Sequence, residues 1–196
     1  MSKFSLYTCS ACGKEHADWP ALAFSSPFHY NCLTEEDKRS LAQIDTDFCV
    51  ITYPDQTDRF IRCVLIMPVN DHCESLHYGL WVSLSEKSFE DYKRNYGNSD
   101  HETSYFGWLS NGLPGCDFVS VPMTVYTQKN GSRPLIVPHK DFAHPLVTDY
   151  YGGITKKEAE HRISMMLNEV DKCETGRLKK VLSTVMKFLR SRATDK

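Results

Sequence analysis

The sequence has no long apolar run and no recognisable export signal. None of its hydrophobic stretches approaches the roughly 20 residues that a membrane-spanning helix needs. The first nine residues, MSKFSLYTC, lack the apolar core of a signal peptide. We therefore expect a cytoplasmic protein, or a nuclear one if the source is eukaryotic, with no membrane association.

The motifs of common nucleotide-binding and hydrolytic enzymes are also missing. The chain contains neither G-x-x-x-x-G-K-[ST] nor G-x-G-x-x-G, the glycine-rich loops that cradle phosphates. It contains neither the G-x-S-x-G of α/β-hydrolases nor the H-E-x-x-H of zinc proteases. Because no complete catalytic signature is present, the sequence favours a binding or interaction protein without catalytic activity.

The composition that is present is that of an ordinary globular chain. Hydrophobic residues make up 41% and charged residues 24% of the 196 residues. This length suits one domain, or one domain with an appended piece. Eight cysteines are many for a reducing compartment, and only Cys9 and Cys12 lie close together in sequence.

A hairpin in residues 59–86 is predicted to form the middle of the fold. Two apolar runs, Phe60–Val69 and Tyr78–Leu84, flank a polar bend at residues 70–75. Runs rich in β-branched and aromatic residues around turn formers are typical of paired strands. In the second run every other residue from Tyr78 shares one face, and the first run is apolar on both faces, as in a covered central strand.

The remaining elements are short. Further strands are expected at residues 47–53, 118–127 and 133–137, with a hairpin turn at Asn130–Gly131 between the last two. Thr34 and Ser88 are expected to cap short helices, the first of which carries Leu41 and Ile44 on one face.

Two glycine- or proline-containing segments are expected to be irregular. Residues 17–33 are predicted to be an extended segment laid over the core. Residues 105–116 hold three glycines, and we interpret them as a structured turn.

The C-terminal part is predicted to be helical. Thr155 and Glu158 form a capping box, after which an apolar stripe follows helical spacing. A second helix is expected after Gly176. The prediction is an α+β fold with a mostly antiparallel sheet in residues 1–154, and a helical extension, 155–196, packed on the same domain.

A cysteine pair near the N-terminus indicates a metal site. The spacing Cys9-x-x-Cys12 lets both thiolates face one ion, and Gly13 permits the tight backbone of a knuckle. His16 and Cys49 are candidates for further ligands, because a closed structural zinc site needs four. A redox pair and a site without metal are the alternatives, so zinc is a hypothesis that needs a metal measurement.

The charge distribution is uneven. Residues 172–196 hold eight Lys and Arg against two Asp and Glu, which leaves fifteen against twenty-three in the rest of the chain. A basic amphipathic helix can contact nucleic acid, which is one alternative function. Packing of this helix on the acidic body of the same domain is the interpretation we favour, so nucleic acid is not the expected partner. If the protein has a partner, we expect it to be another protein.

A cluster of titratable residues supplies a second alternative. His139, Asp141 and His144 lie within six residues, and a hydrolase-type enzyme could use them with Arg62 or Arg133 stabilising an anion. The spacing matches no mechanism that we can name. Exposed loop histidines without a catalytic role are the competing interpretation.

Several motifs occur together in one order along the chain. They are Cys9-x-x-Cys12-Gly13-Lys14-x-His16, Asp47–Phe48–Cys49–Val50–Ile51, Phe60–Ile61–Arg62, the run from Tyr78 to Glu86, the run from Phe106 to Asn111, Leu113–Pro114–Gly115, Arg133–Pro134 and His144–Pro145–Leu146. This series resembles an uncharacterised, mostly bacterial family catalogued as domain of unknown function 2199, over roughly residues 9–154. The resemblance implies a small domain of mixed α and β structure with an N-terminal cysteine knuckle, and it implies no known activity. Ala143 departs from the family pattern, in which an acidic residue precedes His144.

These observations predict a zinc-stabilised interaction module. The proposed partner surface is the aromatic region around Trp81 and Trp108, because large aromatic side chains dominate interface energetics.

Overall fold

The predicted central hairpin is confirmed. The computed structural model describes residues 6–8, 13, 15–17, 19–113 and 120–167. In it, β6 (Thr57–Met67) and β7 (Leu76–Leu84) pair antiparallel from Phe60 opposite Ser83 to Met67 opposite Leu76. Every strand of the larger sheet is connected to this hairpin, directly or through a neighbour.

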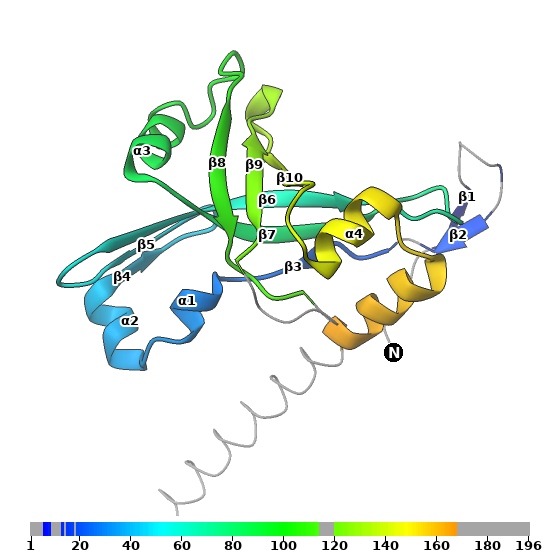
Figure 1. Ribbon diagram of the computed structural model, residues 1–196, viewed down its shortest axis with the longest axis horizontal. Helices are drawn as coiled ribbons and strands as arrows, with labels where there is room; N and C mark the ends of the chain where they lie inside the picture. The colour runs from blue at the N-terminus through cyan, green and yellow to red at the C-terminus, as the bar shows by residue number, and fades with distance from the viewer. Residues whose placement is uncertain (1–5, 9–12, 14, 18, 114–119, 168–196) are drawn as a thin grey trace, which may run out of the picture.

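The hairpin continues into a closed barrel of five strands (Figure 1). β8 (Ser104–Leu109), β9 (Pro122–Tyr126) and β10 (Leu135–Pro138) follow β7 in antiparallel order, and η1 (Lys129–Gly131) joins the last two. β10 then returns to β6 in parallel, where the Val64 N–H donates to the Pro134 carbonyl at 2.8 Å. The predicted mostly antiparallel sheet is thus correct only in part. A meander with an odd number of strands brings its first and last strands together in the same direction, so its closure is parallel.

Three short strands extend the sheet beyond the barrel. β5 (Phe48–Thr52) lies antiparallel to β6, and β4 (Ala42–Ile44) lies on β5. β3 (Leu22–Ala23) pairs in parallel with β7. Ile44 therefore belongs to a strand and not, as predicted, to the preceding helix, which ends at Leu41.

The helices α1 (Phe28–Asn31) and α2 (Glu35–Leu41) lie with β4 and β5 at one end of the molecule (Figure 1). The predicted cap of α2 is confirmed, since the Thr34 hydroxyl accepts from the Asp37 N–H at 3.1 Å. A separate hairpin of β1 (Leu6–Thr8) and β2 (Glu15–Ala17) lies at the other end. The predicted extended segment 17–33 thus contributes β3 but also the helix α1.

The barrel interior holds the main hydrophobic core. Tyr78, Leu80 and Val82 of β7 are fully buried in it, as their alternation predicts. A smaller outer cluster, formed by Cys49, Ile51, Phe60 and Trp81, lies on the opposite face of the β5–β6–β7 ribbon. Side chains from α1, α2 and the residues around them cover it: Tyr30, Leu33 and Leu41.

Helix α3 (Glu86–Arg94) starts earlier than predicted. Its N-cap is Ser85, whose hydroxyl accepts from the Ser88 N–H at 3.3 Å, so Ser88 lies inside the helix. Phe89 and Tyr92 are buried in the main core.

The predicted turn at residues 105–116 is wrong for its first part, which is strand β8. Tyr105, Gly107 and Leu109 face inward, and Phe106 and Trp108 face outward. Gly107 is required by close packing and not by a turn, because a Cβ there would clash with the Val82 side chain and lie 2.7 Å from the Ser83 carbonyl oxygen.

The chain leaves the barrel through helical segments. α4 (Pro145–Gly152) was not predicted and begins after His144. Residues 156–167 are helical, as predicted, and the Glu158 N–H donates to the Thr155 hydroxyl at 3.2 Å. Ala159 and Ile163 of this helix are buried in the main core. The remainder of the predicted extension, including its basic helix, lies outside the described residues.

Candidate functional site

The predicted cysteine knuckle falls in the loop of the β1–β2 hairpin. Cys9 and Cys12 lie outside the described residues. The flanking strands are in register, with Thr8 opposite Glu15, and Gly13 has a φ of +70°. His16 is the middle residue of β2, opposite Tyr7.

Cys49, the fourth proposed ligand, lies in a different environment. It is fully buried in the outer cluster, and burial, with contributions from Asp45 and Asp58, raises the pKa of its thiol to about 12. Strands β5 and β2 lie at opposite ends of the molecule (Figure 1). Within the described ranges, no three His, Cys, Asp or Glu side chains gather in a way that could hold a metal ion.

The two histidines of the predicted cluster have separate local roles. His139 and Thr124 share a hydrogen bond of 3.2 Å between Nε2 and Oγ1. His144 is the N-cap of α4, where its Nδ1 accepts from the Leu146 N–H at 3.1 Å. Arg133 precedes β10, whereas His139 follows it, and Arg133 is engaged by Asp47 at 2.6 Å.

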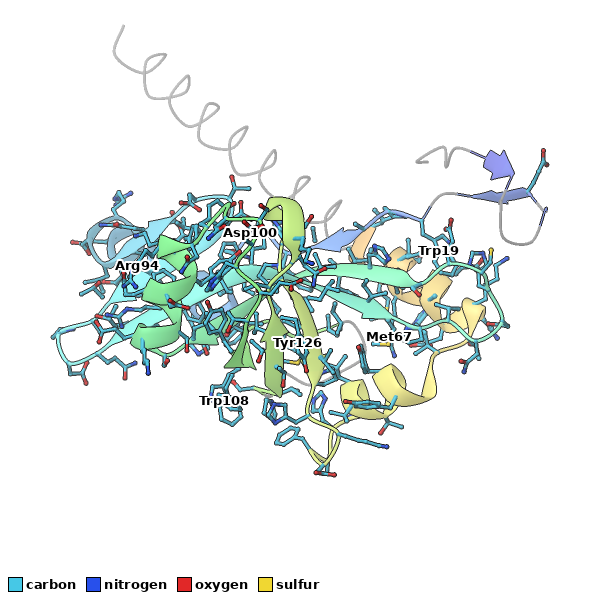
Figure 2. All side chains as sticks on the ribbon, turned by 90° about the horizontal axis from the view of Figure 1, so that it is seen from above. Trp19, Met67, Arg94, Asp100, Trp108 and Tyr126 are labelled. Carbon is cyan, nitrogen blue, oxygen red and sulfur yellow. The ribbon has the colours of Figure 1, made fainter. Side chains whose placement is uncertain are left out.

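The two tryptophans proposed for a partner surface differ in exposure. Trp81 is fully buried, its indole N–H donates to the Phe24 carbonyl at 3.1 Å, and its backbone N–H donates to Asn111 Oδ1 at 2.7 Å. Trp108 is 43% exposed, and in Figure 2 its side chain stands clear of the ribbon at the edge of the molecule. Trp81 is thus a core residue, and Trp108 is on the surface.

Trp108 belongs to an ordered array on the outside of β8, β9 and β10, which we name the aromatic strand face. Cross-strand pairing arranges nine outward residues in three rows. The rows are Ser104–Tyr126–Leu135, Phe106–Thr124–Val137 and Trp108–Pro122–His139. Pro122 is buried, and the other eight residues are partly or fully exposed. None of the nine is an acidic residue, a lysine or an arginine.

Aromatic rings dominate this face. The Phe106 and Trp108 rings meet edge to face, with centroids 5.2 Å apart, and the His139 ring lies 5.5 Å from Phe106. Phe106, Trp108 and Tyr126 are all more than two fifths exposed. A shallow hollow of about 640 Å³ at one end of the face is lined by Tyr126, Leu135 and Val137 and, outside the nine residues, by Glu102.

The sequence contains the signal for this face within the segment predicted to be a turn. Ser104, Phe106 and Trp108 alternate with the inward residues of β8 over six positions. The glycine in the middle of that alternation suggested a turn, whereas it marks a close approach of two strands.

Comparison with known proteins matches the sequence to one family model. The family model described as "Uncharacterized protein conserved in bacteria (DUF2199)" matches residues 8–154. The matched span contains the whole barrel and all nine residues of the aromatic strand face. No curated protein and no solved structure matches the chain. In the part of the chain that the structure describes, no helix has the length and apolarity to cross a membrane.

Proposed function

The chain belongs to the DUF2199 family, whose description names no activity. From the geometry of the structure, we propose that the protein is a non-enzymatic module that binds a partner protein through the aromatic strand face. The observation that carries this proposal is the exposure of Phe106, Trp108 and Tyr126 on a sheet surface without charged residues.

The physical argument starts from what a solvated sheet face ordinarily carries. Antiparallel strands with one face in water alternate apolar residues inward with polar residues outward. Here the outward positions of three adjacent strands are mainly aromatic or aliphatic. Contiguous exposed apolar patches mark interaction sites, and aromatic residues are the most frequent hot spots of protein interfaces.

The absence of charge indicates the kind of partner. The centre of a protein–protein interface is depleted of charged residues. Nucleic-acid surfaces instead rely on Lys and Arg to neutralise phosphates. Lys129, next to the hollow, is paired with Glu102 at 3.1 Å, so its charge is balanced locally. The face therefore fits an uncharged, apolar protein surface.

The hydrolase alternative has little support in this geometry. His139 is part of the aromatic strand face and His144 caps a helix. Arg133, one of the two proposed anion partners, is bound to Asp47. We therefore propose no catalytic role for the His139, Asp141 and His144 cluster.

Zinc remains a second component of the proposal. Cys9 and Cys12, with His16 and one further ligand, would hold an ion between β1 and β2, where it would stabilise two strands of three residues each. The positive φ of Gly13 is compatible with the tight turn that two cysteines at this spacing require. Cys49 is left out of this ligand set, because its strand β5 and strand β2 lie at opposite ends of the molecule (Figure 1).

The test compares partner capture by three proteins expressed at native level in their own cells. They are the natural chain, a Phe106→Ser/Trp108→Ser variant and a Phe28→Ser control, in which an aromatic side chain 42% exposed on α1 is removed instead. A partner should co-purify with the natural and control proteins, and the purified partner should bind the double variant at least about tenfold more weakly. Unfolding midpoints of all three should agree.

Two results would overturn the proposal. One is a partner retained by the double variant with unchanged affinity. The other is that analytical ultracentrifugation finds the natural and control proteins as dimers and the double variant as a monomer. The face would then bind a second copy of the chain.

A further inference from the structure

Arg62 lies on the face of β6 that points away from the barrel core. It is paired with Trp81 of β7, and its guanidinium lies 6.0 Å from the centre of the Trp81 ring. Its Nε atom is buried and makes no hydrogen bond with any part of the chain that the structure describes. Leaving a buried donor unpaired costs free energy, so such a group calls for an explanation.

No carboxylate of the described chain forms an ion pair with Arg62. Its Nη1 reaches only the Thr46 carbonyl, at a long 3.4 Å. The Asp47 carboxylate is engaged by Arg133 at 2.6 Å and by the Tyr96 hydroxyl at 3.0 Å. Burial, together with the nearby charge of Arg133, lowers the pKa of Arg62, and the Asp47 carboxylate offsets part of this effect. Arg62 is thus a partly buried cation without a directly bonded counter-ion among the described residues.

Arg62 lines a shallow, open pocket of about 590 Å³. Polar groups come from Ser25, Asp45 and Thr46, and the apolar surface comes from Tyr30 and Ile44. The pocket thus combines one unpaired cation, one carboxylate and an apolar wall.

The Asp45 carboxylate is held in place by the backbone. Its Oδ1 accepts from the N–H groups of Asp47 at 2.8 Å and Phe48 at 2.7 Å. It lines the same pocket as Arg62, yet no ion pair joins the two among the described residues. A phosphate dianion would be repelled by this carboxylate, whereas an ammonium group would be attracted.

We propose that this pocket binds a free α-amino acid, whose carboxylate accepts from Arg62 and whose ammonium group faces Asp45. The planar guanidinium can present its two terminal Nη groups to a carboxylate as parallel N–H donors. Tyr30 and Ile44 offer an apolar surface to the ligand's side chain. The site does not depend on the aromatic strand face, which belongs to β8, β9 and β10.

The test is a titration of the full chain with each common L-amino acid, followed by thermal shift and calorimetry. At least one should bind saturably at millimolar concentration or below. The same compound without its amino group, the same compound without its carboxylate, and inorganic phosphate should each bind at least about tenfold more weakly. The proposal is overturned if no amino acid binds, or if phosphate or the amine-free analogue binds as tightly.

Variants then locate the site. Arg62→Gln should weaken binding at least about tenfold, whereas Arg39→Gln, which removes an exposed arginine of α2, should leave it unchanged. Ser25→Tyr fills the pocket from an exposed position, so it should block binding even if Arg62→Gln fails to fold. Asp45→Asn keeps the acceptor for the two backbone N–H groups and should weaken the amino acid while leaving the amine-free analogue unaffected. Full affinity in Ser25→Tyr and Asp45→Asn would place the ligand elsewhere and overturn the assignment.

Discussion

The Asp47 carboxylate and the Arg133 guanidinium meet at 2.6 Å, although the two residues are 86 positions apart in the chain. Tyr96 donates its hydroxyl to the other oxygen of Asp47 at 3.0 Å. One carboxylate thus joins the start of β5, the residues after α3 and the approach to β10. The contact lies near the parallel closure of the barrel, where β10 meets β6 in a single residue pair.

We expect Asp47→Ala to destabilise the protein by about 1 kcal/mol. Hydrogen bonds to a charged group contribute roughly 1.5–3 kcal/mol, and the exposure of Arg133 reduces this value through solvent screening. Urea unfolding measures the change. Asp55→Ala, in the exposed turn between β5 and β6, is the matched control and should be neutral. Equal stability of the two variants would show that the Asp47 contact contributes nothing.

Gly107→Ala should destabilise the protein by roughly 2 kcal/mol or more, because the new methyl group meets the Val82 side chain and the Ser83 carbonyl oxygen. The matched control is Gly152→Ala at the end of α4, where a Cβ meets nothing within 4 Å. Chemical unfolding of both variants measures the difference. A neutral Gly107→Ala would mean that β7 and β8 are not packed as closely as the structure places them.

The parts of the fold that were predictable from the sequence are those set by local pattern. The β6–β7 hairpin follows from two apolar runs around a polar bend, and the caps at Thr34 and Thr155 follow from side-chain chemistry within three residues. Barrel closure was not predictable in this way. It depends on one parallel contact between Val64 and Leu135, which no short-range pattern encodes.

The candidate site shows the same limit. Alternation predicts that Trp81 and Trp108 lie on strand faces, but not which outward face the rest of the chain covers. The segment that contains Phe24 and α1 covers Trp81, whereas no described segment covers Trp108. Exposure of a strand face is a tertiary property, and it decides which tryptophan can contact a partner.

The buried thiol of Cys49 should make stability depend on alkaline pH. Burial, with Asp45 and Asp58, raises the pKa of this thiol to about 12 in the folded protein, whereas an unfolded cysteine titrates near 8.5. The unfolded state therefore loses its proton first. The stabilisation that follows from this pKa difference is fully present below about pH 8.5. It is lost as the pH rises towards 12, where the free energy of unfolding falls by up to about 1.4 kcal/mol per pH unit.

Urea unfolding of the natural chain and of Cys49→Ala at several pH values tests this dependence. The variant should be less stable near pH 7, because a buried side chain is truncated, but its stability should fall less steeply above about pH 9. Cys32→Ala, which changes an exposed cysteine, should keep the natural slope. An unchanged slope in Cys49→Ala would contradict a neutral, buried thiol at position 49.

Measurement of zinc content tests whether the proposed knuckle cysteines or the buried Cys49 bind the ion. We expect about one zinc per chain in protein purified without chelators, and none in a Cys9→Ser/Cys12→Ser variant, because serine hydroxyls do not replace two thiolate ligands. The variant should also unfold at lower temperature, since a structural zinc site contributes its binding free energy to folding. Cys49→Ala and the exposed control Cys32→Ser should both retain the metal.

Loss of zinc in Cys49→Ala would return that cysteine to the ligand set, and absence of zinc from the natural protein would contradict the knuckle. Loss of zinc from the double variant without a change in stability would contradict a structural role, because the ion would then occupy an open site.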